Sequence, residues 1–332
     1  MTETALSPDA PFDPAALVAR QHPVVLRGLV RDWPMVRAGL ESSAAAAAYL
    51  KHFYRGTAVV GYTGAPTIGG RFFYDDSGTA MNFTAGRVAL DAYLDRILAT
   101  GGDPHAESLY VGSTDLDTYL PGFRAENDLA GFGDATPLAS IWIGNRTIAA
   151  THFDMSNNVA CCLVGRRRFT LFPPDQVANL YPGPLEPTPG GQVVSMVDPR
   201  APDFQRYPRF ADALEAAYVI DIEPGDVLVY PALWWHNVEA LGAFNVLVNY
   251  WWNAAPRFMD TPMNTLLHGL LSLRDRPASE KQAWRALFDY YVFGPAEQPA
   301  AHLPEAARGA LAPLNDLSAR RLRAQLLQRL NR

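Results

Sequence analysis

Residues 224–236 run Pro-Gly-Asp-Val-Leu-Val-Tyr-Pro-Ala-Leu-Trp-Trp-His, and this stretch decides the class of fold. Its first three residues predict a turn, and the apolar residues 227–230 predict a short strand. Pro231 then predicts a second bend, after which His236 begins another strand. Short strands bounded by such turns are typical of β sandwiches and barrels, a class that includes the jelly rolls.

The same pattern extends outward over residues 136–255. Short runs of β-branched and aromatic residues alternate there with turn residues. Gly, Pro and Asn mark the turns at 144–145, 173–174, 182–184 and 189–191. We therefore predict that residues 136–255 form a β sandwich or barrel that makes up the core of the protein.

A first zone, residues 1–135, precedes this core and mixes short strands with helices. Residues 23–30 predict a strand that ends at the Asp-Trp-Pro sequence following them. Residues 42–50 predict a helix because they are rich in alanine. Residues 88–98 predict another helix because their apolar side chains recur at helical spacing. We expect this α/β zone to pack on the core.

A third zone, residues 256–332, is predicted to be helical. Apolar residues recur at i, i+3, i+4, i+7 and i+8 within 263–271 and again within 284–292, and residues 322–330 carry a narrower stripe. Each stripe needs a partner surface. Packing on the barrel or between the helices satisfies this need, and so does pairing of two chains in a homodimer.

Composition excludes several classes of protein. The chain has 332 residues, of which 48% are apolar, so it can bury a sizeable core and is neither disordered nor a small disulfide-stapled scaffold. Charged residues make up 19%, and the formal net charge is −6. A mildly acidic chain is a poor candidate for binding a phosphate backbone, so we expect no nucleic-acid partner.

Cysteine usage and the N-terminal sequence predict a location. Cys161 and Cys162 are adjacent, and neighbouring residues of a strand point to opposite faces, which disfavours a disulfide or a zinc pair. Residues 1–12 have no basic start and no apolar run of signal length. No stretch reaches the roughly 18 uninterrupted apolar residues of a membrane span. We expect a reduced, cytoplasmic protein without a membrane partner.

The residues that predict chemistry begin with Thr151-His152-Phe153-Asp154. On a strand, His152 and Asp154 point to the same face, and both residue types bind first-row metals. His236, on another predicted strand, supplies a third candidate ligand. Two histidines and one carboxylate that leave coordination positions open are diagnostic of non-haem Fe(II) oxygenases. The His-x-Asp pair alone is weak evidence, but its combination with the Pro-Gly-Asp turn and His236 is specific.

A second candidate residue lies in the strand after Gly165. There Arg167, Phe169 and Leu171 share one face, and this face is the more apolar of the two, so we predict that Arg167 points inward. The planar guanidinium binds a carboxylate with two hydrogen bonds, and that carboxylate can belong to 2-oxoglutarate. The alternative is a surface run of arginines with an internal salt bridge.

Two asparagines lie within the predicted strands of the core. Asn158 follows Asp154, and Asn249 interrupts an otherwise apolar strand at 244–252. A buried asparagine must be hydrogen-bonded. The partner can be the backbone or a bound acid, and the sequence alone leaves both possibilities open.

At these residues the chain resembles the JmjC and cupin-like Fe(II)/2-oxoglutarate oxygenases. It is most similar to the hydroxylase branch typified by the asparaginyl hydroxylase of hypoxia-inducible factor. The resemblance implies a double-stranded β-helix core, mainly β with helices, at 136–255, an N-terminal α/β elaboration at 1–135, and C-terminal helices at 256–332 that form a homodimer. The similarity covers most of the chain, and its motifs lie at residues 23–34, 165–175, 179–183, 202–208, 224–236 and 248–251.

The resemblance assigns roles residue by residue. His152, Asp154 and His236 match the iron ligands of the family. Asn158 and Asn249 match residues of the cosubstrate pocket. No metal ligand is missing, so the resemblance implies an active enzyme with Fe(II) as cofactor and 2-oxoglutarate as cosubstrate.

Two positions depart from the family pattern. Relatives place lysine where Arg167 stands, as the partner of the distal carboxylate of the cosubstrate. Many relatives also have a threonine where this chain has Ala149, and Thr151 or Thr147 can replace its hydroxyl. Tyr110 matches a further hydroxyl partner of that carboxylate.

The implied reaction is C–H hydroxylation coupled to the decarboxylation of 2-oxoglutarate to succinate, on a side chain of a protein or peptide. A small-molecule substrate would leave the same motifs. Residues 71–74 and 82–83 lie in the zone where relatives place the substrate groove. Two alternatives remain, namely a non-catalytic metal-binding cupin-like protein that binds a ligand and a metal cupin of another reaction class.

Overall fold

The computed structural model describes residues 12–103 and 105–331. The chain divides into two units, Met1–Asn253 and Ala254–Arg332, each described here by itself. The prediction that the N-terminal sequence contains no targeting signal concerns mainly residues 1–11. These residues lie outside the described ones.

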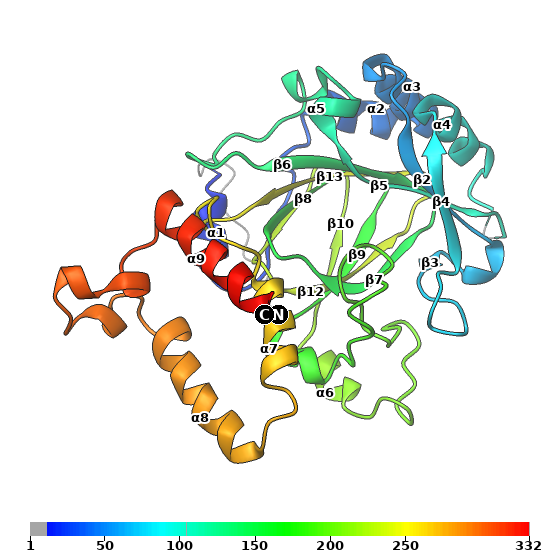
Figure 1. Ribbon diagram of the computed structural model, residues 1–332. Coiled ribbons are helices and arrows are strands. Elements are labelled where there is room, and N and C mark those ends of the chain that lie inside the picture. The colour runs from blue at the N-terminus through cyan, green and yellow to red at the C-terminus, as the bar shows by residue number, and fades with distance from the viewer. Residues whose placement is uncertain (1–11, 104, 332) are drawn as a thin grey trace. The chain divides into compact units, whose positions relative to one another are not determined.

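Two facing sheets form the core of the first unit (Figure 1). All their strand pairs are antiparallel, except that β3 and β7 run parallel. The eight-stranded sheet contains, in spatial order, β1 (Val24–Leu26), β11 (Val227–Tyr230), β8 (Asn157–Val164), β13 (Asn245–Trp252), β6 (Leu138–Gly144), β5 (Ser108–Asp115), β2 (Val59–Gly64) and β4 (Phe83–Val88). The five-stranded sheet contains β10 (Tyr218–Ile222), β9 (Arg167–Phe172), β12 (Trp235–Ala240), β7 (Ile148–Phe153) and β3 (Arg71–Phe72).

The strands from β6 to β13 cross back and forth between the two sheets as the chain proceeds. Only β9 and β10 follow each other within one sheet. This winding is that of a double-stranded β-helix, so the predicted jelly-roll core is confirmed. Strands from the first zone, β2, β4 and β5, extend the eight-stranded sheet beyond β6.

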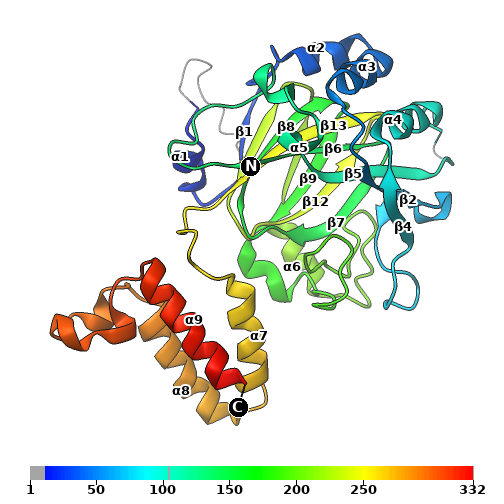
Figure 2. The same ribbon diagram turned by 45° about the horizontal axis from the view of Figure 1, so that its top comes forward.

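Helices cover the outer face of the eight-stranded sheet (Figures 1 and 2). The helices predicted at 42–50 and 88–98 are confirmed, although Val88 ends β4 instead of beginning the second helix. The helices of the first unit are α1 (Pro14–Val18), α2 (Pro34–Glu41), α3 (Ser43–Phe53), α4 (Leu90–Ala99), α5 (Leu116–Tyr119) and α6 (Phe210–Glu215), and its 3-10 turns are Pro66–Ile68, Phe123–Ala125 and Pro174–Ala178.

Strand β8 lies in the middle of the core and is buried on both faces, as a central strand must be. Cys161 packs with the helix-covered cluster on the outer face. Cys162 packs between the two sheets. Both thiols are free and buried, so the prediction that they point to opposite faces and form no disulfide is confirmed.

The second unit is helical, as predicted. It contains α7 (Pro262–Ser272), α8 (Ala278–Phe288), a π-helical turn at Asp289–Phe293, α9 (Asp316–Leu330) and the 3-10 turns Gln298–Ala300, Glu305–Ala307 and Gly309–Leu311. Its exposed large apolar side chains include Leu266, Leu267, Leu271, Trp284, Leu287, Tyr291, Val292, Leu326, Leu327 and Leu330. Pairing of two chains through these helices stays a prediction. Over the described residues, no helix combines the length and apolarity needed to cross a membrane.

The Pro-Gly-Asp turn is tied to the N-terminal strand by the Asp226 carboxylate. Its Oδ1 accepts the backbone N–H of Gly28 at 2.9 Å, and its Oδ2 accepts that of Glu223 at 3.0 Å and a guanidinium N–H of Arg27 at 2.6 Å. These bonds turn the chain away after Leu26, so the strand predicted at 23–30 is limited to Val24–Leu26.

We expect Asp226→Ala to lower the free energy of unfolding by about 2–4 kcal/mol, because two backbone N–H groups and a guanidinium lose their acceptor. The matched control is Asp221→Ala, which removes a surface ion pair with Arg168 and should cost less than about 1 kcal/mol. Urea unfolding of both variants measures the difference. Equal losses would contradict this role of Asp226.

Candidate metal centre

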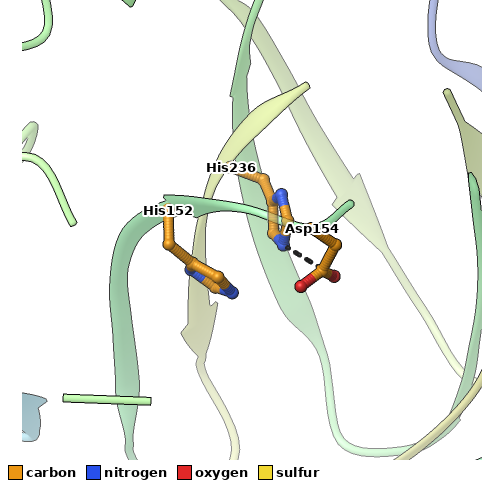
Figure 3. Close-up of side chains that lie close together, drawn as sticks. All are labelled: His152, Asp154 and His236. Carbon is orange, nitrogen blue, oxygen red and sulfur yellow. Dashed lines mark ion pairs between the residues drawn. The ribbon is translucent and has the colours of Figure 1, made fainter. Parts of the chain in front are cut away.

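The centre of the site is a histidine pair held by neighbouring strands. His152 on β7 and His236 on β12 are directly opposite each other in the register, and their ring centroids are 4.3 Å apart. Asp154 follows β7. Figure 3 shows the three side chains converging. One ligand atom from each lies within 4.8 Å of the others, so the structure brings together the three residues proposed as ligands from the sequence.

Backbone carbonyls orient both imidazoles. The Nδ1 of His152 lies 2.8 Å from the carbonyl oxygen of Ala150, and the Nδ1 of His236 lies 3.0 Å from that of Trp234. A carbonyl only accepts hydrogen bonds, so each Nδ1 must carry the proton and each Nε2 keeps its lone pair. Burial, followed by the neighbouring His152, lowers the pKa of His236 to about 4. This histidine is therefore neutral near pH 7, the form that binds a metal.

The carboxylate of Asp154 is held by two N–H donors. Its Oδ2 accepts from Nδ2 of Asn158 at 3.1 Å and from Nε1 of Trp251 at 3.0 Å, and it lies 3.7 Å from Nε2 of His236 (Figure 3). Such partners of a metal-binding carboxylate fix its orientation. Oδ1 takes part in neither hydrogen bond.

The two asparagines form a chain of hydrogen bonds that ends at this carboxylate. The indole N–H of Trp142 donates to Asn249 Oδ1 at 2.6 Å, and Asn249 Nδ2 donates to Asn158 Oδ1 at 3.4 Å. Both asparagines are buried and line the cavity beside the centre. The sequence left the hydrogen-bond partners of the two asparagines open, and in this structure the partners are side chains.

A one-residue bulge in β7 changes which side chains face the cavity. His236 pairs with His152, but Val238 pairs with Ala149, so two residues of β7 oppose one of β12. As a result Thr147 and Ala149 line the cavity together with His152 and Asp154.

Thr151 is buried but lines neither cavity of the site. The expectation that Thr151 contacts the cosubstrate stays a prediction, and these two cavities give it no support. Thr147, the other hydroxyl considered from the sequence, lines both cavities.

Two cavities share His152 and Asp154 in their linings. The inner cavity, about 60 Å³, lies between the sheets. The outer cavity is about 350 Å³. Tyr110, on β5, borders both, and burial raises the pKa of its hydroxyl, so it stays protonated. The other side chains of the inner cavity are Trp142, Thr147, Ala149, Asn158, Ala160, Arg167, Phe169, Tyr230, His236, Val238, Leu247, Asn249 and Trp251.

Arg167 places a cation in the inner cavity. The residue is 4% exposed, and burial lowers the pKa of its guanidinium, which nevertheless remains charged. Its Nη2 reaches only the carbonyl oxygen of Trp142, at 3.4 Å, and its Nε has no partner. Arg168, on the other face of β9, pairs with Asp221 at the surface. The predicted inward direction of Arg167 is thus confirmed.

Among residues 12–103 and 105–331, Arg167 forms no ion pair with a carboxylate, which removes the alternative of an internal salt bridge there. Buried charges in proteins are normally paired. A buried guanidinium with an unpartnered Nε that faces a cavity therefore fits the carboxylate of a ligand.

A family model described as a cupin-like domain matches residues 9–258. This chain belongs to that family. It is 26% identical over 265 residues to HSPB1-associated protein 1 of Rattus norvegicus, covering 73% of this chain and 51% of the relative. It is 37% identical over 106 residues to tRNA wybutosine-synthesizing protein 5 of Danio rerio, covering 32% and 29% respectively.

A further relative is lysine-specific demethylase JMJ31 of Arabidopsis thaliana, 31% identical over 138 residues, which are 39% of this chain and 25% of the relative. The chain thus spans between a quarter and about half of the length of these relatives. The JmjC-type members of the family are oxygenases that typically use Fe(II) and 2-oxoglutarate.

Among the residues that sequence reasoning missed is Trp142 on β6. It begins the chain of hydrogen bonds to Asp154 and also accepts the guanidinium of Arg167 through its carbonyl oxygen. The available signal is the sequence Ile141-Trp142-Ile143, in which alternation places Trp142 on the inner face while its neighbours join the outer core.

We expect Trp251→Phe to weaken Fe(II) binding about 10-fold or more, because Asp154 loses one of its two N–H donors. The matched control is Trp252→Phe, since Trp252 lies on the opposite face of β13 against Phe132 and should leave the affinity unchanged. Anaerobic metal titration followed by calorimetry measures both. Unchanged affinity in Trp251→Phe, or an equal loss in both variants, would contradict the role given to this indole.

Proposed function

We propose that this protein is an Fe(II)- and 2-oxoglutarate-dependent hydroxylase whose substrate is a side chain of a protein or peptide. One observation carries the proposal. The inner cavity has a trio of metal-ligating side chains, His152, Asp154 and His236, on its wall, and the unpaired guanidinium of Arg167 also faces it. A small dicarboxylate that binds a metal through one end needs a cation for the other end.

The donor set fits the implied metal. Two imidazole nitrogens and one carboxylate oxygen suit Fe(II) and leave further coordination positions for ligands. His152, Asp154 and His236 would hold the ion, and Arg167 would hold the distal carboxylate of 2-oxoglutarate. When bound, iron and 2-oxoglutarate supply the oxidising chemistry, which is hydroxylation of a C–H bond coupled to decarboxylation to succinate.

The protein itself positions these groups and excludes water. Carbonyl partners fix both imidazoles, and two N–H donors fix the carboxylate, so the ligand atoms are arranged before a metal enters. Phe169, Leu247 and Val238 line the inner cavity beside Arg167. An apolar lining strengthens the attraction between the guanidinium and a bound carboxylate.

Hydroxyl groups complete the cosubstrate pocket. Tyr110 and Thr147 line the same inner cavity as Arg167 and can donate hydrogen bonds to a carboxylate. Many relatives have a threonine where this chain has Ala149. We assign the role of its hydroxyl, contact with the cosubstrate, to Thr147. Asn158 and Asn249 act on the metal ligand Asp154, through their hydrogen bonds, and line the pocket.

The names of relatives support the class of reaction and differ in the substrate. One is a lysine demethylase, and another takes part in the synthesis of a tRNA base. The net charge of −6 of this chain disfavours a nucleic-acid substrate, and this leaves a protein, a peptide or a small molecule.

We expect 2-oxoglutarate, added anaerobically to the Fe(II) protein, to produce a weak metal-to-ligand charge-transfer band in the visible spectrum. In Arg167→Met the concentration needed for this band should rise about 100-fold, because the distal carboxylate loses a two-point charged partner. Arg168→Met is the control and should titrate like the parent, since Arg168 faces away from the cavity.

Arg167→Met should remain folded, because the substitution removes a buried unpaired charge. Its thermal unfolding checks this point. Metal binding without a charge-transfer band in the parent protein would refute the proposed function. It would leave a non-catalytic metal-binding cupin or a metal cupin of another reaction class.

A further inference from the structure

The outer cavity has an unusual wall. Of the residues that the structure describes, six aromatic side chains border it, and the aliphatic ones larger than alanine are Ile148, Val194 and Pro189. Tyr62, Phe83 and Trp251 are only half buried, so part of each ring faces the cavity. The six aromatic residues are Tyr62 on β2, Phe72 on β3, Phe83 on β4, Tyr110 on β5, Trp142 on β6 and Trp251 on β13.

These rings form a continuous series from the outer strands to the metal centre. Phe83 contacts Tyr62 and Phe72 edge to face, with centroids 5.7 and 5.3 Å apart. Tyr110 follows and stacks on Trp142 at 6.0 Å. Trp142 in turn meets Trp251 edge to face at 5.6 Å. The series ends at the indole whose N–H donates to Asp154.

The charges of the lining exclude ionic substrate groups. Among the described side chains that border the outer cavity there is no lysine, arginine or glutamate, and Asp154 is the one acid in that set. Its Oδ2 already accepts two hydrogen bonds. Arg167 borders only the inner cavity. Once Asp154 holds the metal, a buried ammonium or carboxylate would lack a free counter-charge among these side chains, which costs several kcal/mol.

Polar but uncharged groups lie among the rings. Gln192, Ser113 and Thr147 border the same cavity and can hydrogen-bond to a heteroatom or to the backbone of a substrate. A dry cavity of about 150 Å³ holds one benzene molecule. The volume of about 350 Å³ therefore has room for a ring of one or two cycles with its linker.

We propose that the outer cavity binds an uncharged aromatic or heteroaromatic ring and presents it to the metal centre. Aromatic rings stack on or meet other rings edge to face more favourably than aliphatic groups do. The proposal rests on the function proposed above, because it names the substrate class of that site. The ring can belong to a free small molecule or to a side chain of a peptide, and both present the same chemistry.

The test measures binding of three capped amino acids to the full chain, with and without Mn(II). N-acetyl-tryptophanamide supplies an uncharged ring, N-acetyl-leucinamide an aliphatic group and N-acetyl-lysinamide a cation. Calorimetry and saturation-transfer NMR report binding without any catalytic turnover. We expect the tryptophan compound to bind about 10-fold more tightly than either of the others. Equal binding of the leucine compound, or tighter binding of the lysine compound, would overturn the proposal.

Two adjacent phenylalanines provide matched variants. Phe72 and Phe73 are both 8% exposed, but only Phe72 borders the cavity, whereas Phe73 packs under the guanidinium of Arg71. Phe72→Leu should weaken binding of the tryptophan compound about three- to ten-fold, and Phe73→Leu should not. An equal loss in both variants would show a structural effect and overturn the assignment. Thermal unfolding of both variants verifies that each is folded.

The source of the ring follows from two further probes, free indole and a capped peptide with tryptophan at its centre. Tighter binding of the peptide than of N-acetyl-tryptophanamide assigns the ring to a polypeptide side chain. Binding of indole that matches the peptide assigns it to a small molecule. Either result supports the proposal that the outer cavity binds an aromatic ring. If neither probe binds, the proposal is overturned. The measurement does not involve 2-oxoglutarate, so its failure is separate from failure of the charge-transfer titration.

Discussion

The site depends on the pairing of β7 with β12 and on the single extra residue in β7. The register places His152 directly against His236, and the bulge one step further resets the alternation of β7. Without it, residues 147 and 149 would face away from the side on which His152 and Asp154 lie. With it, Thr147 and Ala149 line the inner cavity on the same side as His152 and Asp154.

The second constraint is electrostatic. The inner cavity contains a buried guanidinium without a carboxylate partner in the described part of the chain, and a carboxylate whose Oδ2 is held by two N–H donors. The unpaired guanidinium is unfavourable in the isolated protein, since buried charges are normally matched. It becomes favourable when an anion binds it, and the fixed carboxylate is ready to bind a cation. The apolar clusters on the outer faces of both sheets provide the stability that lets the core keep these charges.

Much of this site could be predicted from strand alternation alone. The inward direction of Arg167, the opposite faces of Cys161 and Cys162, and the common face of His152 and Asp154 all follow from a period of two. The spacing of turn residues such as Pro-Gly-Asp predicted a β sandwich or barrel, and the family resemblance narrowed this prediction to a double-stranded β-helix. These features are local, so the sequence contains the information that specifies them.

The features that sequence reasoning missed depend on tertiary pairing. The resemblance offered Thr151 or Thr147 as the hydroxyl partner of the cosubstrate, and nothing in residues 147–154 marks the bulge that brings Thr147 to the inner cavity. The strand predicted at 23–30 ends early because Asp226, far along the chain, captures the backbone N–H of Gly28. The aromatic wall joins strands from residues 59–115 to β6 and β13, and no periodicity within one segment shows that these rings meet.

The most direct test of this account is a crystal structure with Mn(II) and 2-oxoglutarate, with the metal located by its anomalous scattering. The account predicts a metal peak bound by Nε2 of His152, Nε2 of His236 and the carboxylate of Asp154. It also predicts the distal carboxylate of 2-oxoglutarate in two-point contact with Arg167. A metal bound elsewhere, or a ligand whose carboxylate lies away from Arg167, would contradict the account.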